Sequence, residues 1–167
     1  ANNKKWKYDR YFQILPSGPD PAVDFSRAWF DTVMQLKPTP KSIAFVAADA
    51  EFARNLKEGA VANAKRLGLK ITYNKNYKPG TPDFTPIIRA VNATNPDVVY
   101  VASYPPGSAG MTRAVSEVGT KVKAFGGGMV GLQFAGIMKG LGPKLNGVLN
   151  FDFYVPEPNM NLYPGVK

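Results

Sequence analysis

The sequence contains no cysteine and no histidine among its 167 residues. It therefore has no thiolate nucleophile, no serine–histidine pair, and no imidazole or thiolate ligand for zinc. Its 12 acidic residues are scattered, without the Asp-x-Asp cluster that would favour a carboxylate metal site. We accordingly expect no metal site and no catalytic residues of these types. A sequence without cysteine also suits an oxidising compartment.

Long hydrophobic runs are absent as well. The sequence has no stretch of about 18 apolar residues, the length that would span a bilayer. It begins Ala-Asn-Asn-Lys-Lys, which lacks the apolar core of a signal peptide. If the protein is exported, we expect this sequence to be mature or truncated material. Hydrophobic residues make up 44% of the sequence, enough for one core in one domain.

Acidic charge is scarce relative to basic charge, since 21 lysine and arginine residues against 12 acidic residues give a net charge of +9. This balance raises the question of nucleic-acid binding, because a basic field attracts phosphate. The basic residues are spread thinly, however, and neither an arginine-rich helix nor an aromatic RNA-binding strand motif occurs. We interpret the charge as a solvated basic surface and expect no nucleic-acid partner.

One stretch shows the organisation of the chain. An apolar run at residues 98–102 is followed by the turn-forming segment Ser-Tyr-Pro-Pro-Gly, and then by apolar residues three and four apart up to residue 118. This pattern predicts a strand, a turn and a helix. A continuous apolar run is typical of a parallel strand that is buried on both faces. Tyr104 lies at its carboxyl end, where sheets of this kind carry their sites.

The same unit recurs along the chain. A short strand at residues 11–15 precedes a helix of about 16 residues, which is predicted to begin after Asp20 because an N-cap residue followed by proline starts a helix. Strands then begin about every 25 residues with a helix between each pair, the spacing of βαβ units. We predict an α/β fold with three layers: a doubly wound, mainly parallel five-stranded sheet in the order 2-1-3-4-5, with helices on both faces. The predicted strands are residues 42–47, 69–73, 98–102, 122–125 and 147–151, and the predicted helices are residues 52–67, 85–94, a segment ending at 118, and 132–141.

In this order the first and third strands are neighbours, and residues 48–52 and 103–106 line the crevice at their carboxyl ends. Asp49 is either a hydrogen-bond acceptor for a cationic ligand group or the N-cap of the next helix. Phe52 either packs on an apolar ligand or joins the core. Tyr104, next to Ser103, is either an aromatic wall and hydroxyl donor for a ligand or a side chain packed under the proline turn.

A glycine-rich stretch also invites a functional interpretation. Residues 126–131 match the pattern G-x-G-x-x-G between a predicted strand and a predicted helix, and Asp152 follows about 20 to 25 residues later. In a dinucleotide site such glycines let the backbone approach a pyrophosphate. That fingerprint normally occupies the first βαβ unit of a sheet, whereas three units precede it here. The other interpretation is a tight turn in which larger side chains would not fit or would block the crevice.

Several segments resemble, in the same order, segments of the leucine/isoleucine/valine-type periplasmic binding proteins. They are residues 41–46, 52–59, 82–88, 95–100 and 145–148. Members of this family are two-lobed solute receptors that feed ABC importers and close on their ligand. The resemblance implies that residues 11–155 form the second lobe only, with residues 1–10 and 156–167 as extended or crossing segments toward a missing first lobe. It also implies a periplasmic, or exported and membrane-anchored, protein that works with a membrane permease.

The resemblance extends to the ligand site. In the amino-acid binders of this family, an aromatic residue after the first strand, a tyrosine after the third and a glutamate after the fourth reach the ligand. The corresponding residues here are Phe52, Tyr104 and either Gly127 or Gly128. Glycine cannot hold a ligand ammonium as glutamate does, which favours an aromatic or aliphatic carboxylate over an α-amino acid. The candidate ligand-binding residues are Asp49, Phe52, Ser103, Tyr104, Gly127, Gly128 and Met129.

No pair of titratable groups stands out as a general acid and base. We therefore predict a non-enzymatic lobe, without a cofactor, that captures a small organic molecule such as an amino acid or an aromatic or aliphatic carboxylate for import. Two alternatives stay open: a nucleotide-dependent enzyme domain that uses residues 126–131, and an effector-sensing domain of a receptor or regulator.

Overall fold

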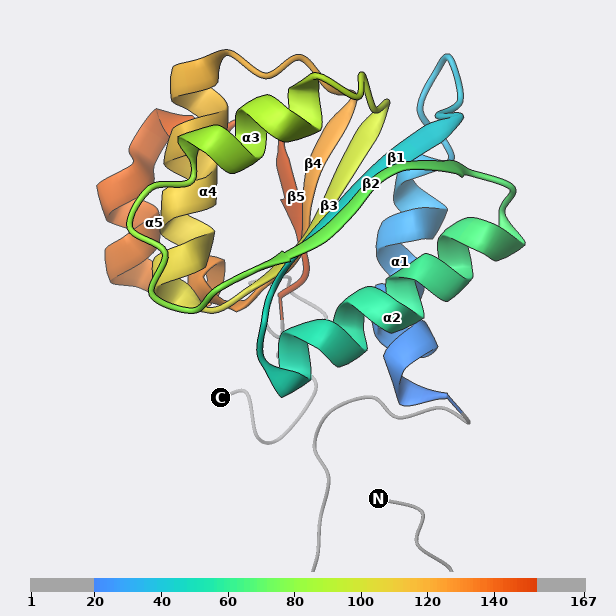
Figure 1. Ribbon diagram of the computed structural model, residues 1–167, viewed down its shortest axis with the longest axis horizontal. Helices are drawn as coiled ribbons and strands as arrows, with labels where there is room; N and C mark the ends of the chain where they lie inside the picture. The colour runs from blue at the N-terminus through green and yellow to red at the C-terminus, as the bar shows by residue number, and fades with distance from the viewer. Residues whose placement is uncertain (1–19, 153–167) are drawn as a thin grey trace, which may run out of the picture.

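The computed structural model describes residues 20–152, which form a parallel sheet covered by helices on both faces (Figure 1). The strands have the order β2-β1-β3-β4-β5, and every neighbouring pair is parallel. This confirms the predicted fold class and strand order. The strands are β1 (Ser42–Ala48), β2 (Lys70–Tyr77), β3 (Val98–Ser103), β4 (Ala124–Met129) and β5 (Val148–Asn150).

The helices form the two outer layers. α1 (Pro21–Val33) and α2 (Glu51–Arg66) pack against each other on one face of the sheet. The opposite face carries α3 (Thr85–Asn92), α4 (Pro105–Val118) and α5 (Ala135–Leu141), as Figure 1 shows. Two short 3₁₀ helices, η1 (Val130–Gln133) and η2 (Gly142–Leu145), flank α5. None of the helices in the described part of the chain has the length and apolar character needed to cross a bilayer.

The core is centred on an aromatic cluster between the sheet and α1. Every residue of β3 is buried, which explains its unbroken apolar sequence. The Tyr100 ring lies 5.2 Å from the Trp29 ring, 6.2 Å from the Phe30 ring and 6.0 Å from the Phe45 ring, measured between centroids. These distances are typical of favourable aromatic pairs, so the cluster anchors α1 on the sheet.

Two predicted helix boundaries follow from local capping. Asp20 caps α1 by accepting a hydrogen bond of 3.3 Å from the Val23 backbone N–H, with Pro21 in the first helical position. Gly119 ends α4 in the left-handed conformation, with φ of 68°, which glycine adopts without a steric penalty. α1 is shorter than expected, since it has 13 residues and ends at Val33.

The structure corrects the prediction for the glycine-rich stretch. The fourth strand was expected to end at residue 125 with a glycine loop after it, but Gly126, Gly127 and Gly128 continue β4 and pair with β3. Neighbouring groups leave no space for side chains at these positions: the Leu149 backbone at Gly126, the Tyr100 ring at Gly127, and the Leu56 side chain at Gly128. A Cβ atom at Gly127 would lie 2.5 Å from the Tyr100 ring.

Three other boundaries also differ from the prediction. β2 continues to Tyr77 instead of ending at Tyr73, because an edge strand tolerates the exposed polar residues that follow. The predicted helix at residues 132–141 is divided between η1 and α5. α3 begins at Thr85 as predicted but ends at Asn92, two residues earlier than expected. The predicted strand at residues 11–15 and the segment from residue 154 onward lie outside the described residues.

Candidate functional site

The candidate site lies where the carboxyl ends of β1 and β3 meet. β1 and β3 are neighbours, whereas β2 lies on the outer side of β1 and β4 on the outer side of β3. The chain therefore leaves these two strands in opposite directions, which creates a topological switch point. α2 and α4 both begin at this edge of the sheet. Phe52 lies in the first turn of α2, and Tyr104 immediately precedes α4.

Aromatic side chains from three elements converge at this edge. The ring centroids of Phe52 and Tyr104 are 6.4 Å apart, with an interplanar angle of 54°. Phe25 of α1 lies 6.2 Å from Phe52 in an edge-on arrangement. Phe52 is 37% exposed, which is unusual for a phenylalanine in a folded domain. The structure thus brings together two predicted site residues and adds Phe25, whose side chain the sequence pattern had assigned only to the apolar face of a helix.

Asp49 is not the N-cap of α2. That position is held by Ala50, without a side-chain cap. The Asp49 carboxylate instead accepts hydrogen bonds from Arg54 at 3.2 Å and from the Asn76 amide at 3.4 Å. The Asp49 side chain is 51% exposed, so its ion pair with Arg54 is solvated and weak. Asp49 remains at the rim of the site with its carboxylate facing two local donors.

Ser103 is buried and belongs to a hydrogen-bond network under the site. Its hydroxyl oxygen lies 2.8 Å from that of Ser108, which donates to the Tyr104 carbonyl at 3.0 Å. The Ser108 oxygen also accepts a 3.1 Å hydrogen bond from the Gly131 backbone N–H. This network joins the end of β3, the start of α4 and η1, so it positions Tyr104. Sequence analysis did not assign Ser108 this role, because its link to η1 depends on Gly131, which is 23 residues away along the chain.

Gly127, Gly128 and Met129 face the core. A Cβ atom at Gly128 would lie 2.8 Å from Leu56 of α2, and the one at Gly127 would meet Tyr100. Met129 is fully buried, and its backbone N–H donates to the Asn150 side chain at 2.9 Å. The dinucleotide interpretation of residues 126–131 is therefore wrong, because the glycines form a buried strand and not a loop open to a pyrophosphate.

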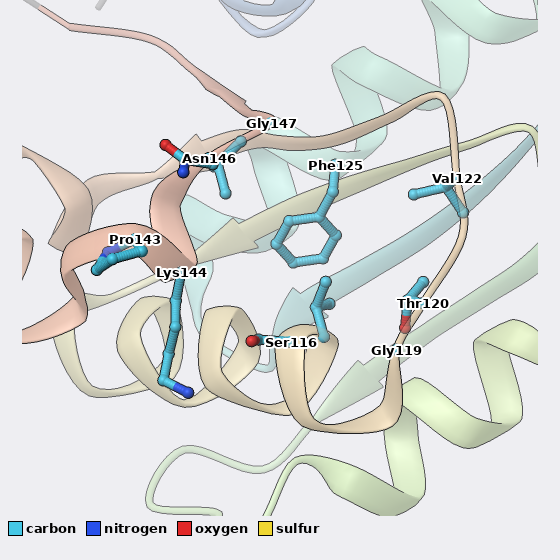
Figure 2. A pocket seen from close by; sticks show the side chains of 11 residues that line it. Ser116, Gly119, Thr120, Val122, Phe125, Pro143, Lys144, Asn146 and Gly147 are labelled. Atoms are coloured by element: carbon cyan, nitrogen blue, oxygen red, sulfur yellow. The ribbon is translucent and has the colours of Figure 1, made fainter.

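One hollow adjoins the aromatic group at Phe25, and a wider one lies away from it. A cavity of about 140 Å³ lies between α1 and the β4–β5 pair, and its lining includes Phe25, Trp29, Tyr100 and Gly127. A wider hollow of about 380 Å³ lies at the opposite, amino edge of the sheet. Figure 2 shows the Phe125 ring in that hollow between the end of α4 and the segment around Lys144. The wider hollow is thus remote from the strand ends at which sites of α/β sheets form.

The chemistry available at the carboxyl edge is that of binding. The described residues contain no group of three or more acidic side chains that could hold a metal ion. Burial, with the neighbouring Tyr104, raises the pKa of Tyr77 to about 12, so its hydroxyl is a neutral donor at physiological pH. Burial also raises the pKa of Tyr100. At the carboxyl edge, Phe52 and Tyr104 are the candidate aromatic groups, whereas Tyr100 lies in the core.

Comparison with known proteins gives a consistent result. The family described as periplasmic binding protein matches residues 3–162. A leucine-binding protein from Thermotoga maritima superposes with a TM-score of 0.72 at 17% identity, over 87% of this chain and 42% of that protein. A binding protein for leucine, isoleucine, valine, threonine and alanine from Brucella ovis gives 0.62 at 20% identity, over 75% of this chain and 32% of that protein.

A third solved structure is an ABC-transporter solute-binding protein from Rhodopseudomonas palustris in complex with 4-hydroxybenzoate. It gives a TM-score of 0.58 at 17% identity, over 64% of this chain and 30% of that protein. This chain thus spans less than half the length of all three proteins. No curated protein matches the sequence. At these identities the structural likeness shows the fold alone.

Proposed function

The chain belongs to the periplasmic binding protein family, and from that membership we propose that it is a ligand-binding lobe of an ABC-importer solute-binding protein. In this proposal a small organic molecule is captured at the carboxyl edge of the sheet. The missing first lobe would cover the ligand from the other side, and a membrane permease would receive it. Such a protein works in the periplasm or attached to the outer side of the membrane.

The observation that carries this proposal is the aromatic pair at the switch point, in which Phe52 is exposed and Tyr104 is half-buried. Phe52 and Tyr104 come from the first turns after two neighbouring strands, and their rings are 6.4 Å apart. An exposed phenyl ring loses unfavourable contact with water when a ligand covers it. The pair therefore suits a ligand with an apolar body that lies across both rings.

The ligand class follows from the missing acid. The residues that follow β3 (104–107) and β4 (130–133) include no carboxylate that could pair with a ligand ammonium. An aromatic or aliphatic carboxylate is thus favoured over an α-amino acid. One structural neighbour was solved with 4-hydroxybenzoate and others are named for branched-chain amino acids, so both classes belong in the test.

The absence of a suitable acid–base pair supports binding without chemistry. Asp49 and Arg54, the charged pair nearest to the aromatic residues along the chain, are both about half exposed and bound to each other. A general base needs a pKa tuned by its surroundings and a clear path to a substrate proton. We therefore propose that the protein is not an enzyme and needs no cofactor.

The test is a titration of the isotopically labelled chain, followed by NMR chemical shifts, with leucine, 4-hydroxybenzoate and NAD added separately. We expect one of the first two ligands to shift the backbone signals of Phe52 and Tyr104. Replacement Phe52→Ala should weaken that response, whereas Lys144→Ala in the hollow at the amino edge should not. Shifts caused only by NAD, or confined to the signals around Lys144 and Phe125, would refute the proposed function.

A further inference from the structure

The hydroxyl of Tyr77 is buried and unpartnered in the described structure. Tyr77 is the last residue of β2, its side chain is 7% exposed, and its hydroxyl has no hydrogen-bond partner there. The ring packs edge-on against Phe84, with centroids 5.1 Å apart. Leaving a buried polar group unpaired costs free energy, so each such group in a native protein requires an explanation.

The hydroxyl lies against the first turn of α4. A Cβ atom at Gly107 would be 2.1 Å from the Tyr77 hydroxyl oxygen and 3.5 Å from the Ser103 Cβ atom. One turn later, a Cβ atom at Gly110 would be 2.4 Å from the Phe84 ring. The two glycines of α4 therefore leave room for Tyr77 and Phe84, and glycine at 107 is what allows the hydroxyl to reach the start of the helix.

The first turn of α4 has a free hydrogen-bond donor and contains no acidic residue. Pro105 and Pro106 have no backbone N–H, so the first backbone donor of the helix is the N–H of Gly107, the residue against which the Tyr77 hydroxyl packs. Tyr104 immediately precedes the helix and supplies another hydroxyl. The partial positive charge of a helix N-terminus favours an anion at this end. Phenolic hydroxyls and an N–H group together fit the two oxygen atoms of a carboxylate.

We propose that the Tyr77 hydroxyl and the first turn of α4 form a subsite for the carboxylate of an aromatic monocarboxylic acid. This inference rests on the proposed function, because it places the ligand body against Phe52 and Tyr104. The ligand oxygen then supplies the partner that Tyr77 lacks. The Tyr77 hydroxyl is shielded from bulk water, so water does not compete for it. Tyr77 should therefore favour ligands that carry a carboxylate over ligands that do not.

The test compares two ligands of the same shape, 4-hydroxybenzoate and 4-hydroxybenzamide, on the full 167-residue chain by NMR titration. Tyr77→Phe should weaken binding of the acid about 10- to 100-fold, the effect of one lost hydrogen bond to a charged group, and should weaken binding of the amide less, about 5-fold, because its neutral carbonyl accepts a weaker hydrogen bond. Tyr73→Phe on the same strand is the matched control and should change neither. The Tm of Tyr77→Phe should equal or exceed that of the original protein, because the deleted hydroxyl has no partner in the described residues.

The outcomes separate this inference from the proposed function. If 4-hydroxybenzoate shifts Phe52 and Tyr104 but Tyr77→Phe binds acid and amide as before, or loses both equally, the subsite is refuted and the function stands. If leucine shifts the signals of Phe52 and Tyr104 and the aromatic acid does not, the subsite is likewise refuted and the proposed function stands. If no ligand shifts those signals, both fall. A second readout, the ¹⁹F signal of 3-fluorotyrosine at position 77, should move more with the acid than with the amide, and equal movement with both would contradict the proposal.

Discussion

Gly127 shows how a single residue is determined by its neighbour across the sheet. Its φ of 120° lies in a region that residues with a side chain rarely adopt, and a Cβ atom there would overlap the Tyr100 ring. Tyr100 in turn fills the centre of the aromatic cluster under α1. The glycine therefore serves the packing of Tyr100, the largest fully buried side chain in the described core.

Replacing Gly127 with alanine should lower the free energy of unfolding by about 2 to 5 kcal/mol, because overpacking and backbone strain add. Gly140→Ala is the control: this glycine lies in α5, and nothing is within 4 Å of a Cβ atom there. It should raise stability by about 0.5 kcal/mol through better helix propensity. Chemical denaturation measures both values, and equal effects at the two positions would contradict the packing argument.

Phe52 is expected to contribute to binding more than to stability. Its ring is partly exposed and contacts Tyr104 and Phe25 only at the rim of the site. Phe52→Ala should weaken binding of the proposed ligand about 10-fold, since an aromatic contact contributes on the order of 1 kcal/mol. Its Tm should change by no more than a few degrees. Affinity by NMR titration and Tm by circular dichroism test this, and a large drop in Tm with unchanged affinity would place Phe52 in the core.

At the scale of whole elements, Asp97 joins three strands at the amino edge of the sheet. Its carboxylate accepts hydrogen bonds from the backbone N–H groups of Lys41 at 2.8 Å and Ser42 at 3.0 Å. Lys123, just before β4, forms an ion pair with it at 2.7 Å. Asp97 directly precedes β3, so one side chain connects the starts of β1, β3 and β4.

This arrangement predicts a pH dependence of stability. The hydrogen bond from Lys123, together with those from Lys41 and Ser42, lowers the pKa of Asp97 to about 2 from an ordinary value of 3.8. A lowered pKa in the folded state stabilises the protein above pH 3.8, and this contribution is lost as the pH falls from about 4 to 2. Asp97→Asn should flatten the pH dependence of the unfolding free energy in that range. Asp31→Asn, on the exposed side of α1, is the control, and an unchanged slope in Asp97→Asn would contradict the assignment.

The contact between α1 and α2 is a second feature at the element scale. A Cβ atom at Gly59 of α2 would lie 2.0 Å from the Ala22 carbonyl oxygen, so the helices approach backbone to backbone. Asn63, one turn later, donates to the Val23 carbonyl at 2.8 Å and to the Ser26 hydroxyl at 2.9 Å. This contact holds the amino end of α1, and with it Phe25, at the aromatic site.

For the whole molecule, the strand order is what produces a site. Phe52 and Tyr104 are far apart along the sequence and become neighbours because β1 and β3 pair. The first turn of α1, close to Phe52, and the end of β5 lie at this same carboxyl edge (Figure 1). The described chain thus gathers aromatic side chains from α1, α2 and the residue before α4 at one edge of the sheet.

A protein that carries this chain together with a first lobe should bind its ligand at least about tenfold more tightly than this chain alone, because the second lobe adds contacts to a preorganised half-site. Ligand should also reduce its radius of gyration, as expected for hinge closure. Small-angle X-ray scattering with and without ligand measures the change. An unchanged radius together with equal affinities would contradict the two-lobed proposal.

The sequence by itself determined the fold class, the strand order, the start of α1 and the end of α4, because apolar periodicity and capping residues act over a few neighbouring positions. It also indicated Phe52 and Tyr104 as candidates, since both follow predicted strands. Only the tertiary structure decided that the glycines at 126–128 form a strand, that Asp49 pairs with Arg54, and that the Tyr77 hydroxyl meets Gly107. These depend on contacts between residues distant in sequence, and a local pattern reports that a residue is buried but not which side chain lies against it.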